Sequence, residues 1–145
     1  MTYIPKKAEW YWAEVIEEIK VERDHRNVVH RNIMLIRADS PNEAYEKALN
    51  LGKQHEGSYK NPAGAAVHTT FRGLGGLGLI YDNLEDGAEL LYKENIEVSP
   101  EQLQKWICPK DQLSLFRPEE RSDIRPDYSS KEIVDEADKL METQE

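Results

Sequence analysis

The 145-residue chain contains a single cysteine, Cys108, so it can form neither an internal disulfide nor a cysteine-built metal site. It has no apolar run long enough for a signal peptide or a membrane span. It also lacks a basic excess, because 19 Lys and Arg stand against 28 Asp and Glu, for a net charge of −9. These absences argue against a secreted disulfide scaffold, and against nucleic acid or a membrane as the main partner. We therefore expect a soluble, cytoplasmic protein.

The residues that commonly carry chemistry do not form a familiar site. None of the four histidines pairs with another at the i, i+4 helix spacing of a metal site. GLGGLG at 73–78 matches the G-x-G-x-x-G dinucleotide pattern, but LIY and a turn follow it where that motif needs a helix. We interpret it as a bent connection between strands, in which glycine permits close backbone approach. Cys108 lies between Trp106-Ile107 and Pro109, which favours a buried structural thiol. We expect no catalytic residue, no cofactor and no metal.

The stretch 39–57 predicts a helix around which the rest of the chain is organised. Ser40 is a good N-cap, Pro41 suits the first helical position and Glu43 stands at the capping-box position. Gly57 is placed to end the helix in a left-handed turn. The helical stripe is small and rich in alanine, which predicts close packing on a sheet; it comprises Ala44, Tyr45, Ala48, Leu51 and Gly52.

Strand patterns flank this helix. Residues 10–22 alternate between apolar and mostly charged, which is typical of a half-buried antiparallel strand, with a bulge or bend near Glu17 where the alternation breaks. Residues 23–27 predict a hairpin loop. Residues 28–38 have an apolar centre on both faces, which favours an inner strand with something packed on each side. Further strands are predicted at 65–72, 79–81 and 88–98.

The C-terminal part carries two more helix signals. Ser99 and Pro100 begin a short helix that Pro109 should end near Ile107. More than half of the acidic excess lies after residue 116. We predict an α+β body at 1–116, a linker at 117–128 and an amphipathic helix at 129–145. The overall expectation is an α+β fold: a mainly antiparallel sheet of about five strands, one central helix on a face, a short second helix and a C-terminal helix.

Two sets of residues are candidate binding sites. Trp10 and Trp12 point to the same face of the first strand, and Ile133 and Leu140 lie in the apolar stripe of the last helix. Tryptophan is enriched in interface hot spots, although packing at the core edge or the end of the sheet is the commoner reason for such a pair. The alternative is a small enzyme or ligand binder with a site on the sheet; its residues would be Glu14, Asn32, His68 and Arg72.

Several segments, in order and spacing, resemble the bacterial family known as domain of unknown function 4288. They are WYWAEV at 10–15, the run RNVVHRNIMLIRADSPNEAYEKA at 26–48, Y-x-N-P-x-G at 59–64, FRGL at 71–74 and LIYDNLEDGAEL at 79–90. The resemblance covers about residues 10–116. It implies a small stand-alone protein with an accessory or immunity-like role, and it brings no activity and no catalytic residue. We therefore expect a non-enzymatic module that binds a protein partner or self-associates.

Overall fold

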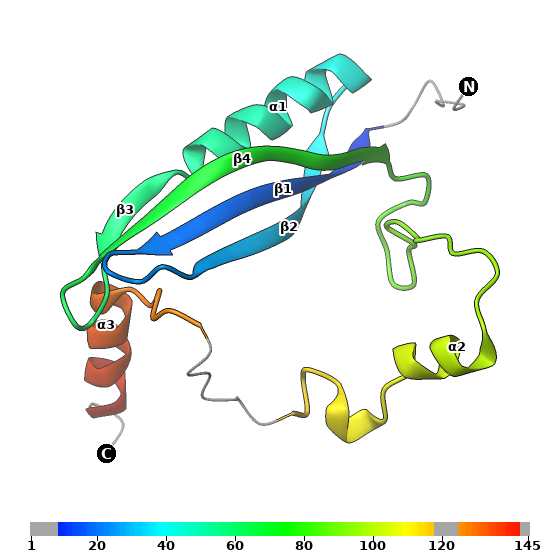
Figure 1. Cartoon of the computed structure of the whole chain (residues 1–145). Coiled ribbons are helices and arrows are strands. Elements are labelled where there is room, and N and C mark those ends of the chain that lie inside the picture. Colours follow the sequence, from blue (N-terminus) through cyan, green and yellow to red (C-terminus); the bar gives the residue numbers. More distant parts are fainter. Residues whose placement is uncertain (1–8, 118–124, 143–145) are drawn as a thin grey trace. The chain divides into compact units, whose positions relative to one another are not determined.

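A computed structural model describes residues 9–117 and 125–142. Within this range the fold is α+β, with one four-stranded antiparallel sheet in the order β2-β1-β4-β3 and three α-helices (Figure 1). The strands are β1 (Trp10–Val21), β2 (Asn27–Arg37), β3 (Gly57–Lys60) and β4 (Ala66–Leu79), and the helices are α1 (Pro41–Gln54), α2 (Pro100–Trp106) and α3 (Lys131–Glu142).

The chain divides into two compact units. The first comprises Met1–Leu91 together with Ile124–Glu145, and it contains the sheet, α1 and α3. The second is Tyr92–Asp123, which contains α2 and a 3-10 turn at Lys110–Gln112. The segments that precede and follow the second unit in the sequence therefore belong to the same unit.

Helix α1 begins as its sequence predicts. The Ser40 side chain accepts a hydrogen bond from the Glu43 amide at 3.1 Å, and Pro41 occupies the first turn. The predicted end is wrong: α1 stops at Gln54 with His55 as C-cap, and Gly57 opens β3 instead. The His55 amide donates to the Leu51 and Gly52 carbonyls of the last turn, each at 3.2 Å. The helix therefore ends without a glycine in the left-handed conformation.

The main core lies between α1 and the sheet (Figure 1). Odd-numbered residues of β1 face the helix, and the buried cluster is Tyr11, Ala13, Val15, Ile36, Ala38, Ala44 and Ala48. Gly52 lets α1 approach closely, because a Cβ atom at that position would collide with the Phe71 ring. A second cluster at the other end of this face consists of Ile19, Val21 and Val67, with Tyr128 packed against it.

The sheet has four strands in the described residues rather than about five. The run 73–78 does not connect two strands; it continues β4, which ends at Leu79, so the separate strand expected at 79–81 does not form. Residues 88–98 form no strand, and Tyr92 and Ile96 are mostly exposed. Short β3 was not expected. The predicted irregularity near Glu17 is confirmed: the register with β4 shifts between Ile16 and Glu17.

The prediction of an inner strand at 28–38 is also wrong. Strand β2 pairs with β1 alone and is an edge of the sheet. Its even-numbered residues face α1, while Val29, Ile33 and Leu35 on the other side are about half exposed. The centre of the strand is apolar on both faces, as its sequence indicates, but composition does not determine how many neighbouring strands it has.

In the second unit, α2 has the predicted start and end. Ser99 caps the helix, and Gln102 completes a capping box with it. Cys108 is exposed, so the expected buried thiol is wrong.

Candidate functional site

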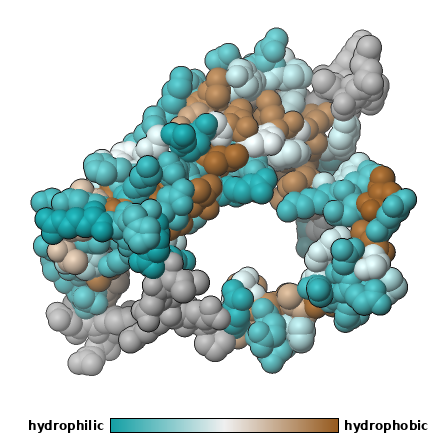
Figure 2. All heavy atoms as spheres, in the orientation of Figure 1, coloured by the Kyte–Doolittle hydropathy of each residue, from teal (hydrophilic) through white to brown (hydrophobic). Residues whose placement is uncertain are grey.

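The face of the sheet opposite α1, here called the outer face, combines tryptophan, aliphatic and paired charged side chains. Alternation along β1 and β2 places ten residues on it: Trp10, Trp12, Glu14, Ile16, Glu18, Val29, Arg31, Ile33, Leu35 and Arg37. Strand β4 continues this face on the other side of β1. In the view of Figure 2, apolar residues lie among polar ones over the part of the chain that holds the sheet and α1.

Trp12 lies across the glycine run of β4. Gly76 and Gly78 pair with β1 next to it, and a Cβ atom at Gly76 would stand 2.8 Å from the Trp12 ring. Gly75 is an extra residue of β4 in a bulge, because Glu14 pairs with Gly76 and Val15 with Leu74. The glycines of the run that matches a dinucleotide motif therefore leave the space that the Trp12 indole ring occupies. No helix follows the run.

The charges of the outer face are matched to one another. Arg31 Nε donates to Glu14 Oε1 at 2.6 Å, and Arg37 stacks over Trp10 at 5.6 Å from the ring centroid. Glu18 accepts a hydrogen bond from Asn27 Nδ2 at 2.7 Å and lies 4.0 Å from Arg72 Nε.

The hydrogen bond from Asn27 is the main reason that the pKa of Glu18 lies below its ordinary value, with Lys20 and Arg72 contributing through their charge.

Between these pairs, three aliphatic side chains of β2 remain open to solvent. Val29, Ile33 and Leu35 are 51%, 49% and 47% exposed. They lie on the same face of one strand, where Ile33 and Leu35 are adjacent and Arg31 separates Ile33 from Val29; these three aliphatic residues are here called the row. An exposed apolar row flanked by tryptophans and charges is a feature of interaction sites.

A second polar feature lies on the α1 side of the sheet. Glu17 is buried, and its Oε1 lies 2.7 Å from Nδ1 of His55 at the end of α1. His30 is the cross-strand neighbour of Glu17 and meets the Tyr128 ring edge-on, with centroids 5.4 Å apart. The sequence does not identify Glu17 or His55 as a site residue. The signal available for Glu17 was its charge at a position of β1 where the alternation predicts a buried apolar residue.

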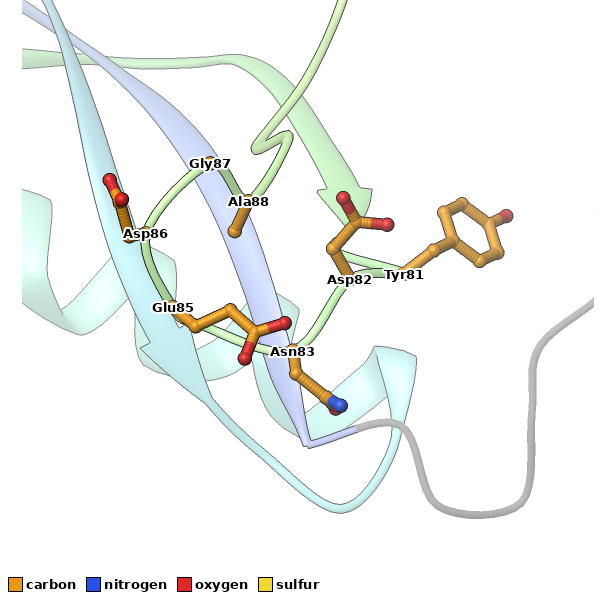
Figure 3. Close-up of a pocket in the computed structure, with 7 residues that line it drawn as sticks. All are labelled: Tyr81, Asp82, Asn83, Glu85, Asp86, Gly87 and Ala88. Atoms are coloured by element: carbon orange, nitrogen blue, oxygen red, sulfur yellow. The ribbon is translucent and has the colours of Figure 1, made fainter.

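The loop after β4 forms a shallow pocket lined by residues 81–83 and 85–88. Figure 3 shows the carboxylates of Asp82, Glu85 and Asp86 pointing in different directions. Asp82 Oδ2 accepts a hydrogen bond from the Glu89 amide at 2.9 Å, so this carboxylate holds the loop together. In the described residues, no group of three or more metal-ligating side chains converges.

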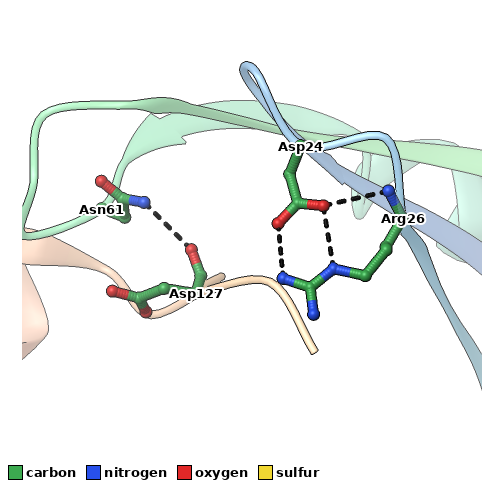
Figure 4. Close-up of polar contacts among 4 residues, drawn as sticks. All are labelled: Asp24, Arg26, Asn61 and Asp127. Carbon is green, nitrogen blue, oxygen red and sulfur yellow. Dashed lines mark hydrogen bonds and ion pairs between the residues drawn. The ribbon is translucent and has the colours of Figure 1, made fainter. Parts of the chain in front are cut away.

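The segment before α3 is fixed to the end of the sheet. Asn61 Nδ2 donates to the Asp127 carbonyl at 3.1 Å, as Figure 4 shows, and the Tyr59 hydroxyl donates to the Tyr128 carbonyl. Pro126 is buried. Residues 126–128, which sequence assigned to a linker, thus cover the second apolar cluster.

The hairpin between β1 and β2 is fastened by its own ion pair, also drawn in Figure 4. Arg26 donates to both carboxylate oxygens of Asp24, at 3.0 and 2.8 Å. These hydrogen bonds hold the pKa of Asp24 at about 2, below its ordinary 3.8. The pair belongs to a turn and orders the start of β2.

The structure separates some of the predicted site residues. Trp10, Trp12 and Glu14 lie together on the outer face, whereas Asn32 is opposite Val15 and faces α1. His68 pairs with Lys20, six residues along β1 from Glu14 or roughly 20 Å away at the usual strand rise.

The remaining predicted residues lie elsewhere. Arg72 is an extra residue of β4 beside Glu18, and Ile133 and Leu140 are 66% and 65% exposed on α3. Glu14, Asn32, His68 and Arg72 therefore do not gather in one site, while the tryptophans of the first set do share a surface.

These features define a small α+β protein in which one helix covers one face of an antiparallel sheet and the other face presents an apolar and aromatic surface. The chain belongs to the family described as Domain of unknown function (DUF4288), whose model matches residues 10–92. That match includes the whole sheet and ends within one residue of the boundary between the two units. Neither the curated proteins nor the solved structures gave a match. No helix in the described ranges is both long and apolar enough to cross a bilayer.

Proposed function

We propose that this protein is a non-enzymatic binding module of accessory type, and that the outer face of its sheet is the surface that binds a protein. The observation that carries the proposal is the half-exposed row of Val29, Ile33 and Leu35 beside Trp10 and Trp12. A surface of this composition gains free energy when a partner removes it from water, at about 25 cal/mol per Å² of apolar area.

The charges around the row support the same function. Glu14 and Arg31 already satisfy each other, and Arg37 is stacked on Trp10. A partner that covers the row therefore needs to desolvate few unpaired charges, which keeps the penalty of binding small. A cytoplasmic location is part of the proposal, because the exposed thiol of Cys108 suits a reducing compartment.

The test compares two lysine variants of equally exposed residues. Leu35 on the outer face and Tyr45 on α1 are both 47% exposed. The wild-type, Leu35→Lys and Tyr45→Lys chains would be cross-linked in the source cells and captured, and bound proteins, including other copies of the chain, would be quantified. We expect a partner that wild type and Tyr45→Lys retain and that Leu35→Lys loses at least tenfold. Equal capture by all three, or no partner with a monomeric mass in solution, would overturn the proposal.

A further inference from the structure

Strand β2 has the composition of an inner strand and the position of an edge. Its eleven residues, NVVHRNIMLIR, are apolar on both faces at the centre, yet only β1 pairs with it. Native sheets normally protect an edge by a short strand, a proline, a bulge or charged residues. Strand β2 has no proline, and its register with β1 is continuous from Asn27 to Arg37. It carries two arginines, but Arg31 is held by Glu14 of β1 and Arg37 is stacked on Trp10, so both lie over the sheet.

The other outer strand shows what a protected edge looks like in this protein. Strand β3 has only four residues and carries a glycine and a lysine. The part of β4 beyond β3 contains two bulges opposite β1, which interrupt a regular ladder. Among the strands of the described sheet, β2 therefore offers the long regular edge.

The direction of the free backbone groups follows from the ladder. The Ala38 amide donates to the Glu9 carbonyl at 2.9 Å, so even-numbered positions of β2 bond to β1. Because hydrogen-bonded pairs alternate in an antiparallel ladder, Val29, Arg31, Ile33, Leu35 and Arg37 direct their N–H and C=O groups outward. In the described part of the chain, only the Arg37 carbonyl has a partner among these groups, Lys47 Nζ at 2.7 Å.

We propose that the partner of this edge is a second copy of the chain, with β2 pairing antiparallel to β2 of the other copy about a twofold axis at Asn32. The two sheets then form one continuous eight-stranded sheet, and their outer faces join. This inference rests on the proposed function, since it names the partner of the outer face and its β2 edge.

Backbone direction, charge and the length of strand that is paired together select this register. Outward-pointing residues must face outward-pointing residues, which excludes a slip by one position. Slips that place Arg31 opposite Arg31 or Arg37 of the other copy bring like charges together. The register centred on Asn32 aligns the full strand from Asn27 to Arg37 and sets Val29 opposite Leu35 of the other copy on both sides of the axis. The two half-exposed aliphatic residues then cover each other.

Disulfide trapping tests the register directly. In a Cys108→Ser background, Asn32→Cys would place two thiols at the axis, in a pair whose Cα atoms lie about 4.5 Å apart, a separation that a disulfide spans. We expect the full-length Asn32→Cys chain to form a covalent dimer under mild oxidation, and the Ile33→Cys chain to form at least tenfold less. A reversed preference, or no dimer from either chain, overturns the proposal.

Solution mass provides the second measurement and does not depend on a cysteine. Wild type and Tyr45→Lys should show twice the mass of one chain by light scattering, and Ile33→Lys should show the mass of one. Ile33 is 49% exposed, so lysine there is compatible with folding, which circular dichroism would verify. If wild type is monomeric but Leu35→Lys still abolishes capture of a different protein, self-pairing is wrong and the binding function stands. If capture is also absent, both fail.

Discussion

Glu17 Oε1 and His55 Nδ1 lie 2.7 Å apart and join the middle of β1 to the end of α1. Glu17 is buried at a position where its neighbours on the same face, Val15 and Ile19, are apolar and buried. The carboxylate therefore stands between the two apolar clusters of the protein. Burial of such a group is tolerated only when it has a hydrogen-bond partner, and His55 supplies it.

Removal of Glu17 should destabilise the fold. We expect Glu17→Ala to lower the free energy of unfolding by about 1–3 kcal/mol, because the hydrogen bond between Glu17 and His55 is lost and a small cavity remains. His55→Ala should lower it less, since that side chain is 43% exposed. Urea denaturation of both variants and of the double variant would give the coupling energy, which we expect to be about 1 kcal/mol. Strictly additive losses would show that the two groups do not interact.

Gly52→Ala should reverse the usual effect of alanine in a helix. Alanine normally stabilises a helix relative to glycine by about 1 kcal/mol. At this position the new methyl group would collide with the Phe71 ring, so we expect a loss of about 1–3 kcal/mol from overpacking. Thermal unfolding would measure it, with Asn50→Ala on the exposed side of α1 as control. Phe71→Leu should recover part of the loss, and a stabilised Gly52→Ala chain would contradict this close packing.

Local signals explain which parts of the fold were predictable. Ser40 and Ser99 cap helices through contacts with residues three positions away, so sequence alone places both starts. Alternation along β1 correctly put Trp10 and Trp12 on one face. The periodicity of 88–98 is just as regular, but it forms no strand, because a strand also needs a partner edge that local sequence does not describe.

Long-range contacts explain what was missed. Strand β2 is an edge because β1 pairs with β2 on one side and with β4 on the other, and nothing pairs with the second side of β2 in the described sheet. The pairing of β1 with β4 joins segments that are far apart in the chain. The contact of Glu17 with His55 and that of Tyr59 with Tyr128 likewise join distant residues. Asn32 and Glu14 were grouped as one candidate site, and only the register of β1 with β2 shows that they lie on opposite faces.

The Asp24–Arg26 pair predicts an unusually acidic carboxyl group. The pKa of Asp24 should be about 2 by NMR titration, because the hydrogen bonds from Arg26 favour the charged form. Since this pKa is depressed, any stability that the pair contributes is complete above the ordinary 3.8 and is lost as the pH falls through about 2. Arg26→Gln should return the pKa of Asp24 toward 3.8. An unchanged value in that variant would assign the shift to something other than the guanidinium.

Tyr59 reports whether the segment before α3 covers the end of the sheet. Burial raises the pKa of Tyr59 above its ordinary 10.0, with smaller contributions from Tyr128 and Asp127. Because the pKa is raised, the associated stability is complete below pH 10.0 and is lost as the pH rises through the folded-state value. Tyr128→Ala would uncover Val67 and Tyr59, so the pKa of Tyr59 should fall toward 10.0.

The same variant should lose stability. We expect Tyr128→Ala to lower the free energy of unfolding by about 2 kcal/mol, less than for a fully buried aromatic residue, because its ring is only partly buried against the second cluster. Tyr92→Ala is the matched control, since Tyr92 is 74% exposed and lies in the other unit. NMR of labelled tyrosine and urea denaturation would give the two quantities together. A Tyr59 pKa and a stability both equal to those of wild type would mean that residues 126–128 do not cover the sheet in solution.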